Sequence, residues 1–307
     1  MKIATTTGDF AFYLEKDEDK IRELHRAGFR YIDLSMYKFT PESEYMQDGW
    51  RDSVKRLGNL AEELGMKFVQ AHSQGGNPLS SDTSHTDFLL RATLRSIEIC
   101  EILGIKNTVV HNGVAEGISK EEWFERNKTF YQKLIPTAER CGVNVLCENS
   151  TASNTGSSYF INTGRDMREF IKYVDNPVIH GCWDTGHANC EGGQYDEIMA
   201  IGDELYAIHY NDNHGVKDDH IAPFLGRLNH DEVMNALIDV GFKGYFTLEC
   251  DSSLIKYNQW TGKRRRFESD KREPKLREPQ LFMQRHIEAM MYDTSKWMLE
   301  SYGLFEE

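Results

Sequence analysis

A short apolar run that ends on a residue able to bind a metal ion occurs six times in this chain. The runs FVQAHS, TVVHNG, VLCENS, HGCWDTGH, YAIHYND and FTLECD end near His72, His111, Glu148, Asp184, His209 and Glu249. Side chains that leave the carboxyl ends of successive strands converge on one site only if the strands are parallel and closed into a barrel. The pattern therefore predicts a divalent-metal site at the mouth of a parallel barrel, and an enzyme.

A second repeated pattern consists of an amphipathic helical stretch, a glycine and then a strand. It occurs in RAGFRYIDLS, ELGMKFVQAHS, ILGIKNTVVHNG, RCGVNVLCENS and DVGFKGYFTLEC. Each glycine stands where the end of a helix needs a left-handed backbone before the chain turns into a strand. The strands are apolar runs without strict alternation, which is typical of strands covered on both faces.

Eight strands alternating with eight helices give the count of a closed barrel. The strands are predicted at Lys2–Thr6, Tyr31–Ser35, Lys67–His72, Asn107–His111, Asn144–Glu148, Val178–Asp184, Leu205–His209 and Gly244–Glu249. The helices are predicted at Asp17–Ala27, Trp50–Leu64, Asp87–Leu103, Lys120–Cys141, Arg165–Val174, Tyr195–Gly202, Asp231–Val240 and Gln280–Tyr302. We therefore expect an α/β fold, a single (β/α)8 TIM barrel over residues 1–307. No G-x-G-x-x-G follows a strand, so a dinucleotide site has no support.

Composition narrows the functional classes. No apolar stretch is long enough to span a membrane, and the acidic N-terminal segment is unlike a secretory signal. The six cysteines include no C-x-x-C pair and are expected as free thiols in a reducing cytoplasm. The net charge of −13 repels phosphate backbones, which disfavours nucleic acid as a partner.

Four of the strand-end residues close four consecutive strands and can surround one ion. They are Glu148, Asp184, His209 and Glu249. Three carboxylates and one imidazole favour Mn²⁺, with Co²⁺ and Zn²⁺ as alternatives, and suit Mg²⁺ less well because of the nitrogen ligand. We predict one divalent metal ion at this point.

The sequence segments around these residues resemble those of a known family. LCENS, CWDTGH, IHYND, DDH, APFLGRLN and GYFTLEC are similar to the sugar phosphate isomerase/epimerase group of the xylose isomerase-like barrel superfamily, which also contains the endonuclease-IV-like abasic-site nucleases. The resemblance implies a sugar or sugar phosphate as substrate and a dimer or tetramer as the assembly. It also implies that Glu148 and Glu249 act as acid and base around a metal-stabilised enediolate.

The resemblance gives further residues roles in binding the substrate. His187 matches a position that contacts a substrate oxygen in the isomerases, and Trp183 could supply an apolar wall against the sugar. Histidines at the third and fourth strand ends and an Asp-x-His in a later loop serve as substrate-binding groups or as supports of the metal ligands. In this chain they are His72, His111, Asp218 and His220.

Two other reactions stay open. Every ligand of the three-zinc nuclease has a counterpart here, namely His72, His111, Glu148, Asp184, His187, His209, Asp218, His220 and Glu249. The acidic net charge and the HNG sequence at the end of the fourth strand disfavour a nuclease function. Dehydration of a keto-sugar or keto-inositol would begin with the same proton abstraction as isomerisation. A metal-binding protein without catalysis is the remaining possibility.

A basic segment interrupts the acidic chain after the last predicted strand. The connection Asp251–Pro279 contains KRRRF, and residues 258–278 carry more Lys and Arg than Asp and Glu. This segment is interpreted either as a surface insertion or subunit contact, or as a lid or phosphate-binding loop, because loops after strands seven and eight often hold phosphate in this fold.

Overall fold

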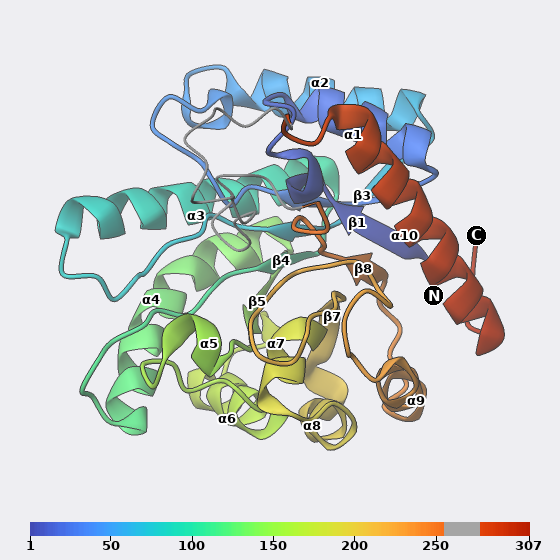
Figure 1. Cartoon of the computed structure of the whole chain (residues 1–307). Coiled ribbons are helices and arrows are strands. Elements are labelled where there is room, and N and C mark those ends of the chain that lie inside the picture. Colours follow the sequence, from blue (N-terminus) through green and yellow to red (C-terminus); the bar gives the residue numbers. More distant parts are fainter. Residues whose placement is uncertain (255–276) are drawn as a thin grey trace, which may run out of the picture.

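The computed structural model describes residues 1–254 and 277–307, and its centre is a barrel of eight parallel strands (Figure 1). The strands are β1 (Ile3–Thr6), β2 (Tyr31–Ser35), β3 (Lys67–His72), β4 (Asn107–Val109), β5 (Asn144–Glu148), β6 (Ile179–Asp184), β7 (Leu205–His209) and β8 (Phe246–Leu248). Each strand pairs with its neighbours in chain order, and β1 pairs with β8. A parallel bridge between Tyr210 and Leu248 joins β7 to β8, so the strands form a closed circuit.

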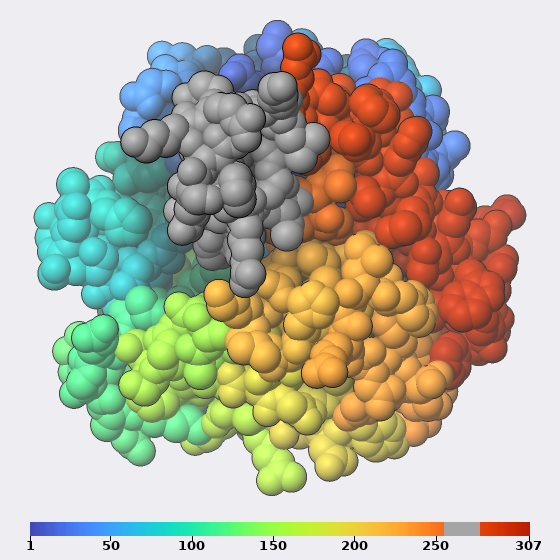
Figure 2. All heavy atoms as spheres, viewed as in Figure 1, coloured from blue at the N-terminus to red at the C-terminus, as the bar shows by residue number. Residues whose placement is uncertain are grey.

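Among the described residues, eight helices surround the barrel, one after each strand. They are α1 (Asp17–Ala27), α2 (Trp50–Glu63), α3 (Thr83–Leu103), α4 (Lys120–Cys141), α6 (Gly164–Val174), α8 (Tyr195–Ile201), α9 (His230–Asp239) and α10 (Leu281–Ser301). The space-filling view shows successive segments following one another around the rim in chain order, from blue through green and yellow to red (Figure 2). The main apolar core lies between these helices and the outer faces of the strands. The predicted parallel (β/α)8 barrel is confirmed.

The sequence predicted the elements well and their ends less well. The α3 helix begins at Thr83 rather than Asp87, because the Asp82 side chain accepts hydrogen bonds from the Ser84 and His85 amides and caps the helix earlier. The β4 strand ends at Val109, so His111 lies just beyond it. Two short helices, α5 (Ala152–Thr155) and α7 (Thr185–Glu191), follow β5 and β6 and were not predicted.

The predicted glycine positions have the backbone that the pattern required. Gly104 ends α3 with a φ of 71°, and its amide donates to the Cys100 carbonyl. Gly142 ends α4 in the same left-handed conformation, with a φ of 62°. A residue with a Cβ atom is strained in this region, so glycine allows each helix to end shortly before the chain enters the next strand.

The interior of the barrel is half apolar and half polar. Because side chains alternate along a strand, the residue two positions before a strand-end residue also points inward. Seven such residues, all buried, form this inner layer: Asp33, Gln70, Val109, Leu146, Cys182, Ala207 and Thr247. The four from β4 to β7 form their own apolar cluster. The three from β2, β3 and β8 are polar and hydrogen-bonded to one another.

The two ends of the chain meet on the outside of the barrel. The Glu306 amide donates to the Met1 carbonyl at 3.0 Å, which places the segment after α10 against β1 (Figure 1). All six cysteines are free thiols, and all but Cys190 are buried. In residues 1–254 and 277–307, no helix is long and apolar enough to cross a membrane. The basic segment Lys263–Arg266 lies outside the described residues, so its predicted role as a lid or phosphate-binding loop stays a prediction.

Candidate metal centre

The four residues predicted to surround one ion lie together at the carboxyl ends of the strands. Ligand atoms of Glu148, Asp184, His209 and Glu249 all lie within 4.8 Å of one another. Nδ1 of His209 is 2.5 Å from Oε1 of Glu148 and 3.3 Å from Oε2 of Glu249. The side chains of Asp184, His209 and Glu148 are buried, whereas that of Glu249 is 21% exposed. We call this set the central group.

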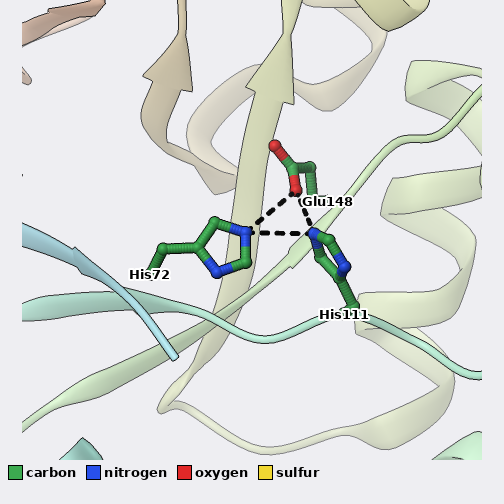
Figure 3. Close-up of side chains that lie close together, drawn as sticks. All are labelled: His72, His111 and Glu148. Atoms are coloured by element: carbon green, nitrogen blue, oxygen red, sulfur yellow. Dashed lines mark hydrogen bonds and ion pairs between the residues drawn. The ribbon is translucent and has the colours of Figure 1, made fainter. Parts of the chain in front are cut away.

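A second set shares Glu148 with the central group and comprises the two histidines from β3 and the end of β4. Nε2 of His72 and Nε2 of His111 lie 3.0 Å apart, and Nε2 of His111 is 2.8 Å from Oε2 of Glu148 (Figure 3). The close-up shows the two rings and the carboxylate pointing toward one another from three different segments. We call this set the β3–β4 group.

A third set lies on the other side of Asp184. Ligand atoms of Asp184, His187 and His220 lie within 4.8 Å of one another. Oδ2 of Asp218 is 3.1 Å from Nε2 of His187 and 3.0 Å from Nε2 of His220. We call these four residues the α7 group. The three sets form one continuous cluster that contains every residue predicted to bind metal or substrate except Trp183.

Local structure explains how the α7 group is positioned. Asp184 ends β6 and caps α7, because its side chain accepts a hydrogen bond from the His187 amide. Asn149 holds both residues: its side chain bonds the backbone of Asp184, and its carbonyl is 2.8 Å from Nδ1 of His187. His220 has a φ of 46°, a left-handed conformation that a residue with a side chain rarely adopts. Such strain persists where surrounding contacts hold it, often at functional sites.

Opposed charges set the ionisation of the cluster. Burial would raise the pKa of Glu148, but His209, His111 and His72 hold it well below its usual range. Burial raises the pKa of Glu249 despite the nearby His209 and His220. Burial also raises the pKa of Asp184, although His187 and His220 oppose this. The two glutamates are therefore shifted in opposite directions.

Two histidines of the α7 group, His187 and His220, favour the positively charged form in return. Burial would lower the pKa of His187, but Asp184 and Asp218 raise it to about 10. Burial likewise opposes the charge on His220, and Asp218 raises its pKa well above the ordinary value. The imidazolium groups thus neutralise the negative charge of the buried carboxylates, which a bound cation would otherwise neutralise.

A divalent cation fits the central group on chemical grounds. Its donors are three carboxylates and one imidazole, a set that suits Mn²⁺, Co²⁺ or Zn²⁺. The carboxylates are concentrated in a buried space where their mutual repulsion is weakly screened, and a 2+ charge would relieve it. The β3–β4 and α7 groups also offer three ligand atoms each.

The cluster opens into a cavity of about 200 Å³. One wall carries groups from the three sets, and the opposite wall comes from the ends of β1 and β2, from the segments that follow them and from α1. That second wall, which the sequence analysis missed, includes Thr6, Lys20, Ser35, Tyr37 and Lys38. The Tyr37 ring meets His72 and His111 edge-on, with ring centres 5.1 and 5.6 Å apart. Tyr37 and Lys38 lie in the segment after β2, which has no recognisable motif, so no spacing in the sequence marked them.

Two findings revise the predicted set of side chains. Trp183 does not line the cavity: it is fully buried in the apolar core, and its indole N–H donates to Gln194. Its strand parity explains the difference, because Trp183 precedes the inward-pointing Asp184 and therefore faces outward toward the helices. Asn154 on α5 does line the cavity and donates to Asp218 at 2.8 Å, although the sequence analysis did not select it.

Comparison with known proteins places the chain in a family. The model of the xylose isomerase-like TIM barrel family matches residues 21–284. The chain belongs to this family. The chain is similar to D-psicose 3-epimerase from Ruminiclostridium cellulolyticum, with 31% identity over 137 residues, 43% of this chain and 43% of that protein.

The chain is also similar to a protein with a different named activity and to a solved structure. Mannonate dehydratase from Thermotoga petrophila is 23% identical over 245 residues, 76% of this chain and 65% of that protein. The crystal structure of a D-psicose 3-epimerase in the presence of D-fructose superposes with a TM-score of 0.74 at 17% identity, covering 97% of this chain and 99% of the other. At that identity the superposition establishes the shared fold.

Proposed function

We propose that this protein is a divalent-metal-dependent sugar epimerase or isomerase. The observation that carries the proposal is the pair of glutamates, Glu148 and Glu249, that both contact Nδ1 of His209 at the rim of one cavity. Two carboxylates with pKa values shifted in opposite directions are suited to act as base and acid in the same reaction. The partial match to D-psicose 3-epimerase supports a ketose as the substrate.

In this proposal the residues of the site have separate roles in metal binding, proton transfer and substrate binding. A divalent ion held by the central group would stabilise negative charge on the substrate oxygens as a Lewis acid. Glu148, whose pKa is low, removes the proton next to the carbonyl. Glu249, whose pKa is raised, returns a proton to the reacting carbon, and the two roles exchange in the reverse direction. His187 lines the cavity and is positively charged near neutral pH, so it attracts a substrate oxygen electrostatically.

The remaining predicted residues complete the binding of the sugar in this proposal. His72 and His111 lie beside Tyr37 and bind substrate hydroxyls on one side of the cavity, and Asp218 and His220 bind them on the other. We retain a cytoplasmic location and a homo-oligomeric dimer or tetramer as proposals, the latter to be measured by light scattering.

Proton transfer makes a direct isotopic prediction. When the protein converts a ketose such as D-psicose in deuterium oxide, deuterium should appear in the product at the carbon whose configuration changes, because the returning proton comes from a carboxyl group that exchanges with solvent. Mass spectrometry and proton NMR of the product measure it. Product that forms without deuterium would instead indicate a hydride shift. Release of water with formation of a deoxy-keto product would favour a dehydratase, the activity of the Thermotoga relative.

The β3–β4 and α7 groups favour a second candidate, a three-metal phosphodiesterase acting on abasic DNA. Both groups offer three ligand atoms that adjoin the central group. The net charge of −13 weighs against a DNA substrate. Elemental analysis of the purified protein should give one Mn, Co or Zn atom per chain under our proposal. Three zinc atoms per chain together with nicking of an abasic-site oligonucleotide would replace it with the nuclease.

A further inference from the structure

Asp33 contacts the metal-ligand cluster from beneath, in the polar half of the inner layer. Oδ2 of Asp33, on β2, is 3.3 Å from Nε2 of His209, on β7, and accepts a hydrogen bond from the Gln70 side chain at 2.8 Å. Asp33 is 1% exposed and His209 is fully buried. The two ring nitrogens of His209 therefore face different partners: Nδ1 faces Glu148 and Glu249, and Nε2 faces Asp33.

A carboxylate is unusual in the interior layer of a barrel of this kind. TIM-barrel interiors are usually filled by branched apolar side chains, as Val109 and Leu146 fill the opposite half here. A buried carboxylate is costly unless it is paired and hydrogen-bonded. Oδ1 of Asp33 has no hydrogen-bond partner among the described residues, so the stabilising contacts of the group converge on Oδ2. The ring N–H of His209 is the polar group that pairs with Asp33 across the barrel.

The contacts of His209 determine which of its ring nitrogens can bind a metal ion. A histidine that binds a metal commonly donates its other ring N–H to a carboxylate, which sets the tautomer and the ring orientation. With the proton on Nε2 directed at Asp33, Nδ1 is the nitrogen whose lone pair would bind an ion held by the central group. Nδ1 is 2.5 Å from Oε1 of Glu148 and 3.3 Å from Oε2 of Glu249.

We propose that Asp33 is the positioning residue of the metal centre, and that its hydrogen bond holds His209 with Nε2 protonated and Nδ1 free to bind a divalent ion. This rests on the proposed function only in requiring that the wild-type protein binds such an ion. Gln70 supports the arrangement, because its amide donates to the same oxygen of Asp33 and its own oxygen accepts from Thr247.

The test measures metal affinity and the ring proton separately. Asp33→Leu removes the acceptor and Asp33→Asn keeps an acceptor without the charge. After removal of bound metal, titration calorimetry with Mn²⁺ should show affinity about 10–100-fold lower for the leucine variant and an intermediate loss for asparagine. In the zinc-loaded proteins, labelled with ¹⁵N-histidine, the slowly exchanging Nε2–H signal of His209 should be present in the wild type and lost in the leucine variant.

Glu23→Gln is the matched control, because Glu23 is a buried carboxylate paired with Arg26 and Arg285 away from the barrel interior. It should leave both measurements at wild-type values. Circular dichroism and thermal unfolding establish that each variant is folded. If folded Asp33→Leu binds Mn²⁺ as tightly as the wild type, or keeps the Nε2–H signal, Asp33 has no positioning role. If the wild type itself binds no divalent ion, the proposed function fails first, and the two failures are distinguished by that titration.

Discussion

Glu249→Gln should lower turnover of the ketose by a factor of about 10² to 10⁴ while the fold remains intact. The amide keeps the size of the side chain and one oxygen, but it can neither give nor take the proton, and general acid–base catalysis contributes roughly this factor. Glu249 is partly exposed at the cavity rim and its pKa is raised, so it is the carboxyl group best placed to hold a proton for the substrate. Steady-state kinetics with metal-saturated protein measures the loss.

The comparison with Glu148→Gln sharpens this result. Glu148 belongs to both the central group and the β3–β4 group, so its replacement should reduce metal affinity as well as turnover. Glu249→Gln should affect turnover more than affinity, because Glu249 belongs to the central group alone and is its partly exposed member. Glu63→Gln on the exposed surface of α2 is the control and should behave as the wild type. Wild-type turnover in Glu249→Gln would remove this residue from the mechanism.

Removal of the metal ion should abolish activity and lower the melting temperature. An ion that binds only the folded protein stabilises it by about 2.7 kcal/mol when its concentration is 100 times the dissociation constant. Dialysis against a chelator, followed by calorimetry and by an activity assay before and after addition of Mn²⁺, measures both effects. Activity that survives complete removal of metal would contradict the proposed mechanism.

The stabilising effect of the ion should depend on pH with a defined sign. In the ion-free cluster, Asp184 and Asp218 outweigh burial and raise the pKa of His187 to about 10, above the ordinary value of 6.5. A group whose pKa is raised on folding contributes stability that is fully present below about pH 6.5 and is lost as the pH rises through about 10. Protons also compete with the ion for imidazole nitrogens, as at His209. The difference in melting temperature between loaded and ion-free protein should therefore increase from pH 6 to pH 9.

Particular residues show why some of this could be predicted. The glycines at helix ends and the apolar runs between them are local signals, and they predicted the order of strands and helices. The strand-end residues were found because a parallel barrel brings all strand ends to one mouth whatever the loops do. Asp33 was missed, although an aspartate in the middle of the apolar strand YIDLS was a visible signal. Trp183 was wrongly assigned to the cavity because strand parity was not applied one residue before Asp184.

The barrel and the residues at its mouth could be predicted from periodicity and chain order alone. The orientation of His209, with Nδ1 toward the glutamates and Nε2 toward Asp33, depends on the three-dimensional fold, because Asp33 and His209 are 176 positions apart in the chain. The three-dimensional fold also decided that Tyr37 and Lys38 form the wall opposite the acidic cluster. Such contacts follow from how strands and loops meet around a closed circuit, and that geometry is not encoded in the spacing of residues along any one segment.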